Sequence, residues 1–119
     1  METQKGLYLG TEINEKWRRR YVQSGFLARG NGQYWFDDKG FYFLRTLTRE
    51  PIFISFDKIF GVKLGKWHSG RWAFGNLILK IIWELDGLKL SSGFIVSKNS
   101  EEIMELKKIL EGKISRKNF

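Results

Sequence analysis

The chain has 119 residues, enough for one domain that buries roughly two-thirds of the surface exposed by its unfolded form. It contains no cysteine and a single histidine, which excludes disulfides and cysteine-based zinc sites. Its formal net charge of +8 favours an anionic partner such as nucleic acid, phospholipid headgroups or an acidic protein, although such a charge also serves solubility.

The sequence of the first 20 residues does not decide between a strand, an arm and a helix. Leu7–Gly10 has the composition of a short strand or an arm, whereas Thr11, with acidic residues after it, resembles the start of a helix over Thr11–Arg20. We expect residues 1–20 to be an N-terminal arm or short helix, residues 21–112 to be the main domain, and residues 113–119 to be a basic tail.

From Tyr21 onwards the apolar residues recur with a period of two, which is typical of β-strands. Turn residues separate the predicted strands: Gly30-Asn31-Gly32, Asp37–Gly40, a bend near Asp57, and Asp86-Gly87, a strong hairpin signal. Gly65–Gly75 is predicted to be one long loop, and Gly93 predicts a bulge or bend. The predicted strands are residues 21–29, Gln33–Phe36, Phe41–Leu47, Ile52–Phe56, Lys58–Leu64, Asn76–Leu85 and Leu88–Ser97.

The pattern after these strands predicts one amphipathic helix over Asn99–Glu111. Asn99 and Glu102 have the spacing of a capping box, and Gly112 stands where a left-handed cap ends a helix. The predicted apolar stripe consists of Ile103, Leu106, Ile109 and Leu110.

The order of about seven antiparallel strands and one C-terminal helix, with the stretches 61–65, Lys66–Trp72, Leu79–Trp83 and Leu90–Ser97, resembles small prokaryotic pleckstrin-homology-like (PH-like) and GRAM-like domains. The resemblance covers roughly residues 20–111. It implies a mainly β fold, a bent antiparallel barrel capped by the helix, and binding of phosphoinositides, other lipids or peptides rather than catalysis. In phosphoinositide-binding relatives, basic residues on the first two strands and their connecting loop cradle the headgroup. The loop expected there, Gly30-Asn31-Gly32, is too short to wrap such a ring.

Two basic and aromatic clusters are candidate anion-binding sites. The first is Lys16, Trp17, Arg18, Arg19 and Arg20, which suits phosphate groups of lipid or nucleic acid or else forms a solvated helix end. The second is the loop with Lys66, Trp67 and Arg71, which suits shallow insertion into a membrane interface. In this loop we expect Trp72 to fold back onto the barrel, whereas the sequence does not decide whether Trp67 is buried or exposed. His68 is either a pH sensor or has no specific role.

The aromatic residues between Tyr34 and Phe43 lie on both faces of a predicted hairpin. One face belongs to the core, and the other is free to stack nucleic-acid bases beside Arg29 and Arg45, or to support a homodimer. A nucleic-acid interface requires Tyr34, Phe36 or Tyr42 to be exposed.

No catalytic motif stands out. Asp37-Asp38 lies in a predicted turn with the two carboxylates pointing apart, Ser91-Ser92 has no histidine nearby in sequence, and nothing indicates a metal or a cofactor. The chain has no apolar run of about 20 residues, and Met1–Lys5 lacks the apolar core of a signal peptide. The sequence predicts a non-enzymatic, cytoplasmic binding module, with peripheral membrane attachment left open. Its expected ligand is an anionic membrane surface or an acidic protein, and the alternative is a nucleic-acid-binding β-barrel.

Overall fold

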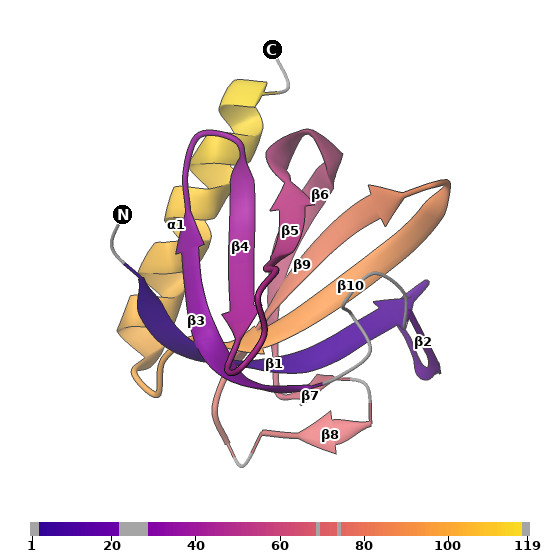
Figure 1. Ribbon diagram of the computed structural model, residues 1–119, viewed down its shortest axis with the longest axis vertical. Helices are drawn as coiled ribbons and strands as arrows, with labels where there is room; N and C mark the ends of the chain where they lie inside the picture. The colour runs from indigo at the N-terminus through magenta and orange to yellow at the C-terminus, as the bar shows by residue number, and fades with distance from the viewer. Residues whose placement is uncertain (1–2, 22–28, 69, 74, 118–119) are drawn as a thin grey trace.

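The computed structural model describes residues 3–21, 29–68, 70–73 and 75–117. Within these residues the chain forms a main sheet, a small separate hairpin and one α-helix at the C-terminal end (Figure 1). The elements in chain order are β1 (Gln4–Ile13), β2 (Lys16–Arg20), β3 (Gly30–Phe36), β4 (Gly40–Arg45), β5 (Ile52–Ser55), the 3-10 turn η1 (Phe56–Lys58), β6 (Ile59–Gly65), β7 (Trp67–His68), β8 (Arg71–Trp72), β9 (Ile78–Leu85), β10 (Leu88–Ile95) and α1 (Ser100–Lys117).

The main sheet is an antiparallel path in the order β5-β4-β3-β1-β10-β9-β6, to which β2 adds by pairing with β1. Among the described strands no ladder joins β5 to β6, so the sheet is bent but not closed. The helix lies against β6 and η1. Strands β7 and β8 pair with each other in a separate hairpin, which is at the bottom of the molecule in Figure 1. The predicted mainly β architecture with one C-terminal helix is therefore confirmed.

The N-terminal segment is part of the sheet. β1 occupies a central position between β3 and β10, and β2 is a strand rather than the end of a helix. The predicted turn at Gly30-Asn31-Gly32 is wrong, because these residues lie in β3 and pair with Tyr8, Leu7 and Gly6. Gly32 serves close packing instead, since a Cβ there would lie 2.2 Å from the carbonyl oxygen of Leu44. The strand predicted over residues 21–29 falls largely on residues 22–28, outside the described residues.

The closing hairpin and the start of the helix are confirmed. Asp86 and Gly87 have φ values of 51° and 82° in the turn between β9 and β10. The Asn99 side chain caps α1 by accepting a hydrogen bond from the Glu101 amide at 2.9 Å. The predicted bulge is present, but it lies on β1 between Tyr8 and Gly10, opposite Gly93.

The helix continues beyond its predicted end. It passes through Gly112 and includes residues of the predicted basic tail, because Ile114 is buried and extends the apolar stripe by another turn. The buried stripe consists of Ile103, Leu106, Leu110 and Ile114, whereas Ile109 is 42% exposed. Tertiary packing therefore outweighs the weak helix propensity of the glycine.

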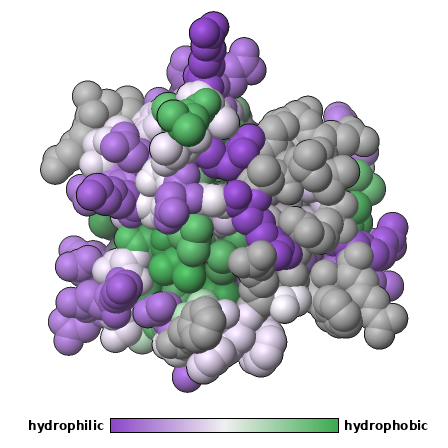
Figure 2. Space-filling view, turned by 60° about the horizontal axis from the view of Figure 1, so that its bottom comes forward, coloured by the Kyte–Doolittle hydropathy of each residue, from purple (hydrophilic) through white to green (hydrophobic). Residues whose placement is uncertain are grey.

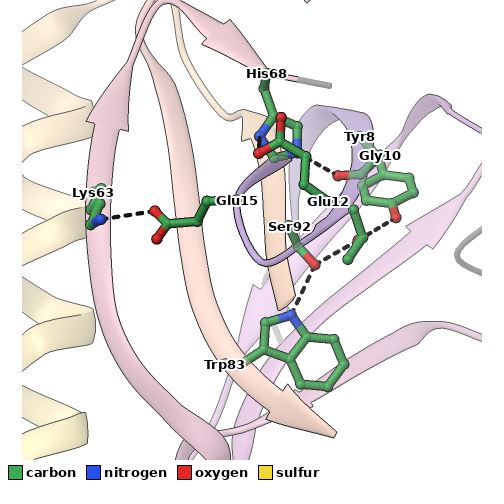
Figure 3. Close-up of polar contacts among 9 residues, drawn as sticks. Tyr8, Gly10, Glu12, Glu15, Lys63, His68, Trp83 and Ser92 are labelled. Carbon is green, nitrogen blue, oxygen red and sulfur yellow. Dashed lines mark hydrogen bonds and ion pairs between the residues drawn. The ribbon is translucent and has the colours of Figure 1, made fainter. Parts of the chain in front are cut away.

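The core lies between the concave face of the sheet and the helix. Tyr8, Phe41, Phe43 and Phe94 are fully buried there, with neighbouring ring centroids 5.0–6.1 Å apart. A buried polar chain accompanies these rings: the Tyr8 hydroxyl lies 2.6 Å from that of Thr11, which lies 2.7 Å from that of Ser92. The Trp83 indole donates to the Ser92 hydroxyl at 3.0 Å (Figure 3).

Candidate functional site

The predicted basic cluster Lys16–Arg20 forms strand β2. The turn before it consists of Asn14 and Glu15, with φ values of 56° and 57°, the left-handed pair that a two-residue hairpin turn requires. In the ladder with β1, Lys16 pairs with Ile13 and Arg20 pairs with Glu12. Lys16 and Arg19 are exposed, and Trp17 and Arg18 lie between them along the strand. The cluster is therefore an extended basic strand that projects beside the main path of the sheet (Figure 1).

Glu15 fastens the tip of this extension to the sheet. Its two carboxylate oxygens bind different lysines: Oε1 lies 2.8 Å from the Lys63 ammonium on β6, and Oε2 lies 3.1 Å from that of Lys89 on β10. Hydrogen bonds from Lys63 and then Lys89 hold the pKa of the Glu15 carboxyl below its ordinary value. The Asn14 amide also donates to the Lys89 carbonyl at 2.8 Å.

The second predicted cluster is a short hairpin rather than a loop. Trp67 on β7 pairs with Trp72 on β8, and His68 pairs with Arg71. Ladder partners lie on the same face of a hairpin and successive residues on opposite faces, so the tryptophan pair faces away from the His68 side. Trp67 is 63% exposed and Trp72 is 47% exposed, with ring centroids 6.5 Å apart, and Lys66 beside them is exposed. The prediction that Trp72 folds back onto the barrel is therefore wrong.

The opposite face of this hairpin rests on the convex side of the sheet. His68 is buried, and its Nε2 lies 2.8 Å from the carbonyl oxygen of Gly10 on β1. Its Nδ1 lies 3.6 Å from Oε1 of Glu12, which is also buried (Figure 3). Sequence reasoning identified His68 but had no signal for these partners, which are more than fifty positions away along the chain.

The two predicted clusters meet at one strand. Glu12 on β1 is the ladder partner of Arg20 and also lies beside the imidazole of His68. The basic strand β2 and the β7–β8 hairpin, called the tryptophan hairpin below, therefore both contact β1. Figure 2 turns the hairpin end of the molecule towards the reader and shows an apolar area bordered by hydrophilic side chains.

The structure also corrects the position of the first loop. The first two neighbouring strands of the main path are β1 and β3, so their connection is residues 14–29 rather than Gly30-Asn31-Gly32. This connection is longer than predicted and contains the whole basic strand β2. The objection that the loop is too short for an anionic headgroup therefore no longer applies.

The aromatic surface proposed for nucleic acid has a different form. Tyr34 is buried in the core, and Phe36 is half-buried against it. On the outer face Tyr42 is half-buried between Trp35 and Phe53, with ring centroids 5.2 and 4.8 Å away. These rings contact one another across three strands, and such cross-strand aromatic pairs stabilise a sheet.

Two of the residues considered for catalysis, Asp37 and Ser92, have hydrogen-bond partners in the structure. Asp37 accepts hydrogen bonds from the Lys39 and Gly40 amides of its own turn and from the Tyr42 hydroxyl. The Ser92 hydroxyl belongs to the buried polar chain of the core. Among the described residues, no group of three or more acidic, histidine or cysteine side chains is arranged to hold a metal ion. Nor is any helix in the described part of the chain long and apolar enough to cross a membrane.

Comparison with known proteins agrees with this architecture. No curated protein sequence matches the chain. A family model described as bacterial PH domain-like matches residues 1–109, which is most of the chain. The match and the seven-strand antiparallel path with its C-terminal helix show that this chain belongs to the bacterial PH-domain-like family.

Proposed function

We propose that this chain is a non-enzymatic binding module that attaches peripherally to an anionic membrane surface. Membership of the bacterial PH-domain-like family supports a binding role in general. The observation that carries the finer proposal is the exposed pair of Trp67 and Trp72 on the β7–β8 hairpin. Indole rings favour the headgroup region of a bilayer because they combine an apolar body with a polar N–H. Two such rings on one hairpin face form a shallow membrane anchor.

The charges around this anchor support the same proposal. Lys66 is exposed next to the tryptophan pair, and Arg19 is exposed on the basic strand β2. Each basic residue near an anionic bilayer contributes about 1 kcal/mol before salt screening. The basic residues of β2 lie in the connection between β1 and β3. The resemblance to phosphoinositide-binding PH domains implies basic residues at such a connection. We propose Lys16, Trp17, Arg18, Arg19 and Arg20 as the first contact and Lys66, Trp67 and Arg71 as the second.

A nucleic-acid interface is less well supported. It required Tyr34, Phe36 or Tyr42 to be free for base stacking, but Tyr34 is buried and the other two are half-buried. An acidic protein partner would use the same cations but gives no reason for two exposed tryptophans at a hairpin. The tryptophan pair therefore favours the membrane.

Tryptophan fluorescence tests the proposal directly. On mixed phosphatidylcholine–phosphatidylglycerol vesicles we expect a blue shift of the emission, and on phosphatidylcholine alone none, because insertion moves the indoles into a less polar medium. The double variant Trp67→Ala/Trp72→Ala should lose the shift and most of the vesicle binding. Phe60→Ala is the matched control, since Phe60 on β6 is 64% exposed but lies outside the hairpin.

An unchanged blue shift in the double variant would contradict the proposal. So would binding to single-stranded oligonucleotides, with a steep salt dependence, in the absence of vesicle binding. Binding to neither would leave an acidic protein as the partner to test.

A further inference from the structure

Among the described residues, the tryptophan hairpin (β7 and β8) packs on the sheet beside two buried side chains. Of the described side chains between Lys66 and Gly75, His68 and Ala73 are buried. Ala73 packs with Leu9 and Ile78 in a small apolar cluster on the convex side of the sheet. His68 supplies the polar part of the attachment, and it is the only histidine of the chain.

The hydrogen bond of this imidazole determines where its proton lies. The Gly10 carbonyl oxygen can only accept, so Nε2 carries the hydrogen and donates it across 2.8 Å. In the neutral ring, Nδ1 then has no hydrogen. Consistent with this assignment, Nδ1 has no hydrogen-bond partner among the described residues, although it lies 3.6 Å from a carboxylate oxygen of Glu12.

The ring lies in a space that a glycine leaves open. A Cβ at Gly93 on β10 would lie 2.4 Å from Cδ2 and 2.6 Å from Cγ of His68. Contacts this short do not occur, so any side chain at Gly93 would displace the imidazole. The side chain of His68 has 0% of its surface exposed, and a second proton on the ring would place a cation in a site without water contact.

Some of the groups around the imidazole raise the pKa of His68, and others lower it. Burial is the largest effect and lowers the pKa of His68 below its ordinary value of about 6.5, while Glu12 on β1 and the Gly10 hydrogen bond raise it. Lys80 on β9 and Arg29 before β3 lower the pKa further by repulsion, and Arg71 is the ladder partner on β8. Because the docked state has the lower pKa, docking is favoured above about pH 6.5 and weakens as the pH falls towards the docked-state pKa.

We propose that His68 is an acid-sensitive latch: the neutral imidazole docks the β7–β8 hairpin on the sheet, and the protonated imidazole releases it together with Trp67 and Trp72. Each unit by which docking lowers the pKa weakens docking tenfold once the ring is fully protonated. Its biological use rests on the proposed membrane function. An anionic leaflet has a surface potential of about −30 mV, which lowers the local pH by about half a unit and favours release at the membrane.

Nuclear magnetic resonance tests the latch without any lipid. The single histidine gives one set of imidazole signals, which we would follow from pH 8 to about pH 5. The indole signals of Trp67 and Trp72, assigned with Trp67→Phe and Trp72→Phe, should change with the same midpoint, below pH 6.5. His68→Gln keeps an N–H donor but cannot titrate, so it should remove the step. A midpoint at or above 6.5, or indole signals that ignore the titration, would overturn the proposal.

A second variant separates release from titration. Gly93→Ala should displace the ring mechanically and release the hairpin at pH 7.5, which faster trypsin cleavage after Lys66 or Arg71 would report. Gly61→Ala is the matched control, since a Cβ there meets no atom within 4 Å. Equal cleavage of Gly93→Ala and the control would also overturn the latch. Vesicle binding is measured separately, so a failed titration and a failed membrane function can be told apart.

Discussion

Removing the charge of Arg18, Arg19 and Arg20 should weaken binding to anionic vesicles by about two orders of magnitude at low salt. Three cations at about 1 kcal/mol each give about 3 kcal/mol before screening, and 1.4 kcal/mol corresponds to a tenfold change. Among the described strands β2 pairs with β1 alone and lies outside the seven-strand path, so the triple Arg→Gln variant should keep its free energy of unfolding to within about 1 kcal/mol.

The assay is sedimentation with phosphatidylcholine–phosphatidylglycerol vesicles over a range of lipid concentrations. The matched control is the triple change of Lys39, Lys58 and Lys108 to Gln, which removes the same charge from exposed positions on the β3–β4 turn, η1 and α1. The control should lose much less affinity, and the difference should shrink at about 0.5 M salt, where the screening length is only a few Å. Equal losses in the two variants would refute the reasoning, because binding would then depend on net charge rather than on β2.

Three further predictions concern stability and are measured by urea unfolding. Ser92→Ala removes the hydroxyl that accepts the hydrogen bond of the Trp83 indole in the core, and should lower the free energy of unfolding by about 1–3 kcal/mol. A decrease below about 0.5 kcal/mol would show that this hydrogen bond is not needed. Asn99→Ala removes the cap of α1 and should cost about 1 kcal/mol, whereas an unchanged midpoint would mean that the helix start is held by packing alone. Gly87→Val forces a β-branched residue to a φ of 82° and should cost at least about 1–2 kcal/mol; a neutral result would indicate that the turn can change its conformation.

The features that could be predicted from sequence depend on neighbouring residues. The Asp86-Gly87 turn needs two residues that tolerate positive φ, and the start of α1 needs an acceptor at Asn99, so each signal is contained in a few positions. The end of the helix could not be predicted in this way. It depends on the burial of Ile114 against the rest of the core, which no local pattern specifies.

The glycines were misread for a similar reason. Gly32 has the local appearance of a turn residue, but it is needed because the backbone of Leu44 on the neighbouring strand comes close. Gly93 was predicted to mark a bulge or bend, and a bulge lies opposite it on β1, but nothing in the sequence indicated that its nearest side chain is the imidazole of His68, which comes from a separate hairpin. Close approaches between distant segments leave a glycine in the sequence but no sign of its partner.

The sequence suggested residues for the candidate site, which remain a prediction, but not the way in which the fold arranges them. Charge and aromatic content identified Lys16–Arg20 and the segment around Trp67, because both are visible in composition alone. Their support by β1 could not be predicted, since the first 20 residues also fit a helix. Glu12 links the two clusters because Arg20 is its ladder partner and His68 lies beside its carboxylate. His68 is 56 residues further along the chain, so no local pattern indicates this contact.

The most direct test of the membrane proposal is co-sedimentation of the unmodified chain with vesicles of pure phosphatidylcholine and of phosphatidylcholine–phosphatidylglycerol, at low salt and at about 0.5 M salt. We predict that the protein sediments with the anionic vesicles at low salt, that the bound fraction falls at high salt, and that the neutral vesicles retain little. Equal retention by both kinds of vesicle, or retention by neither, would contradict the proposal that this PH-domain-like chain recognises an anionic membrane surface.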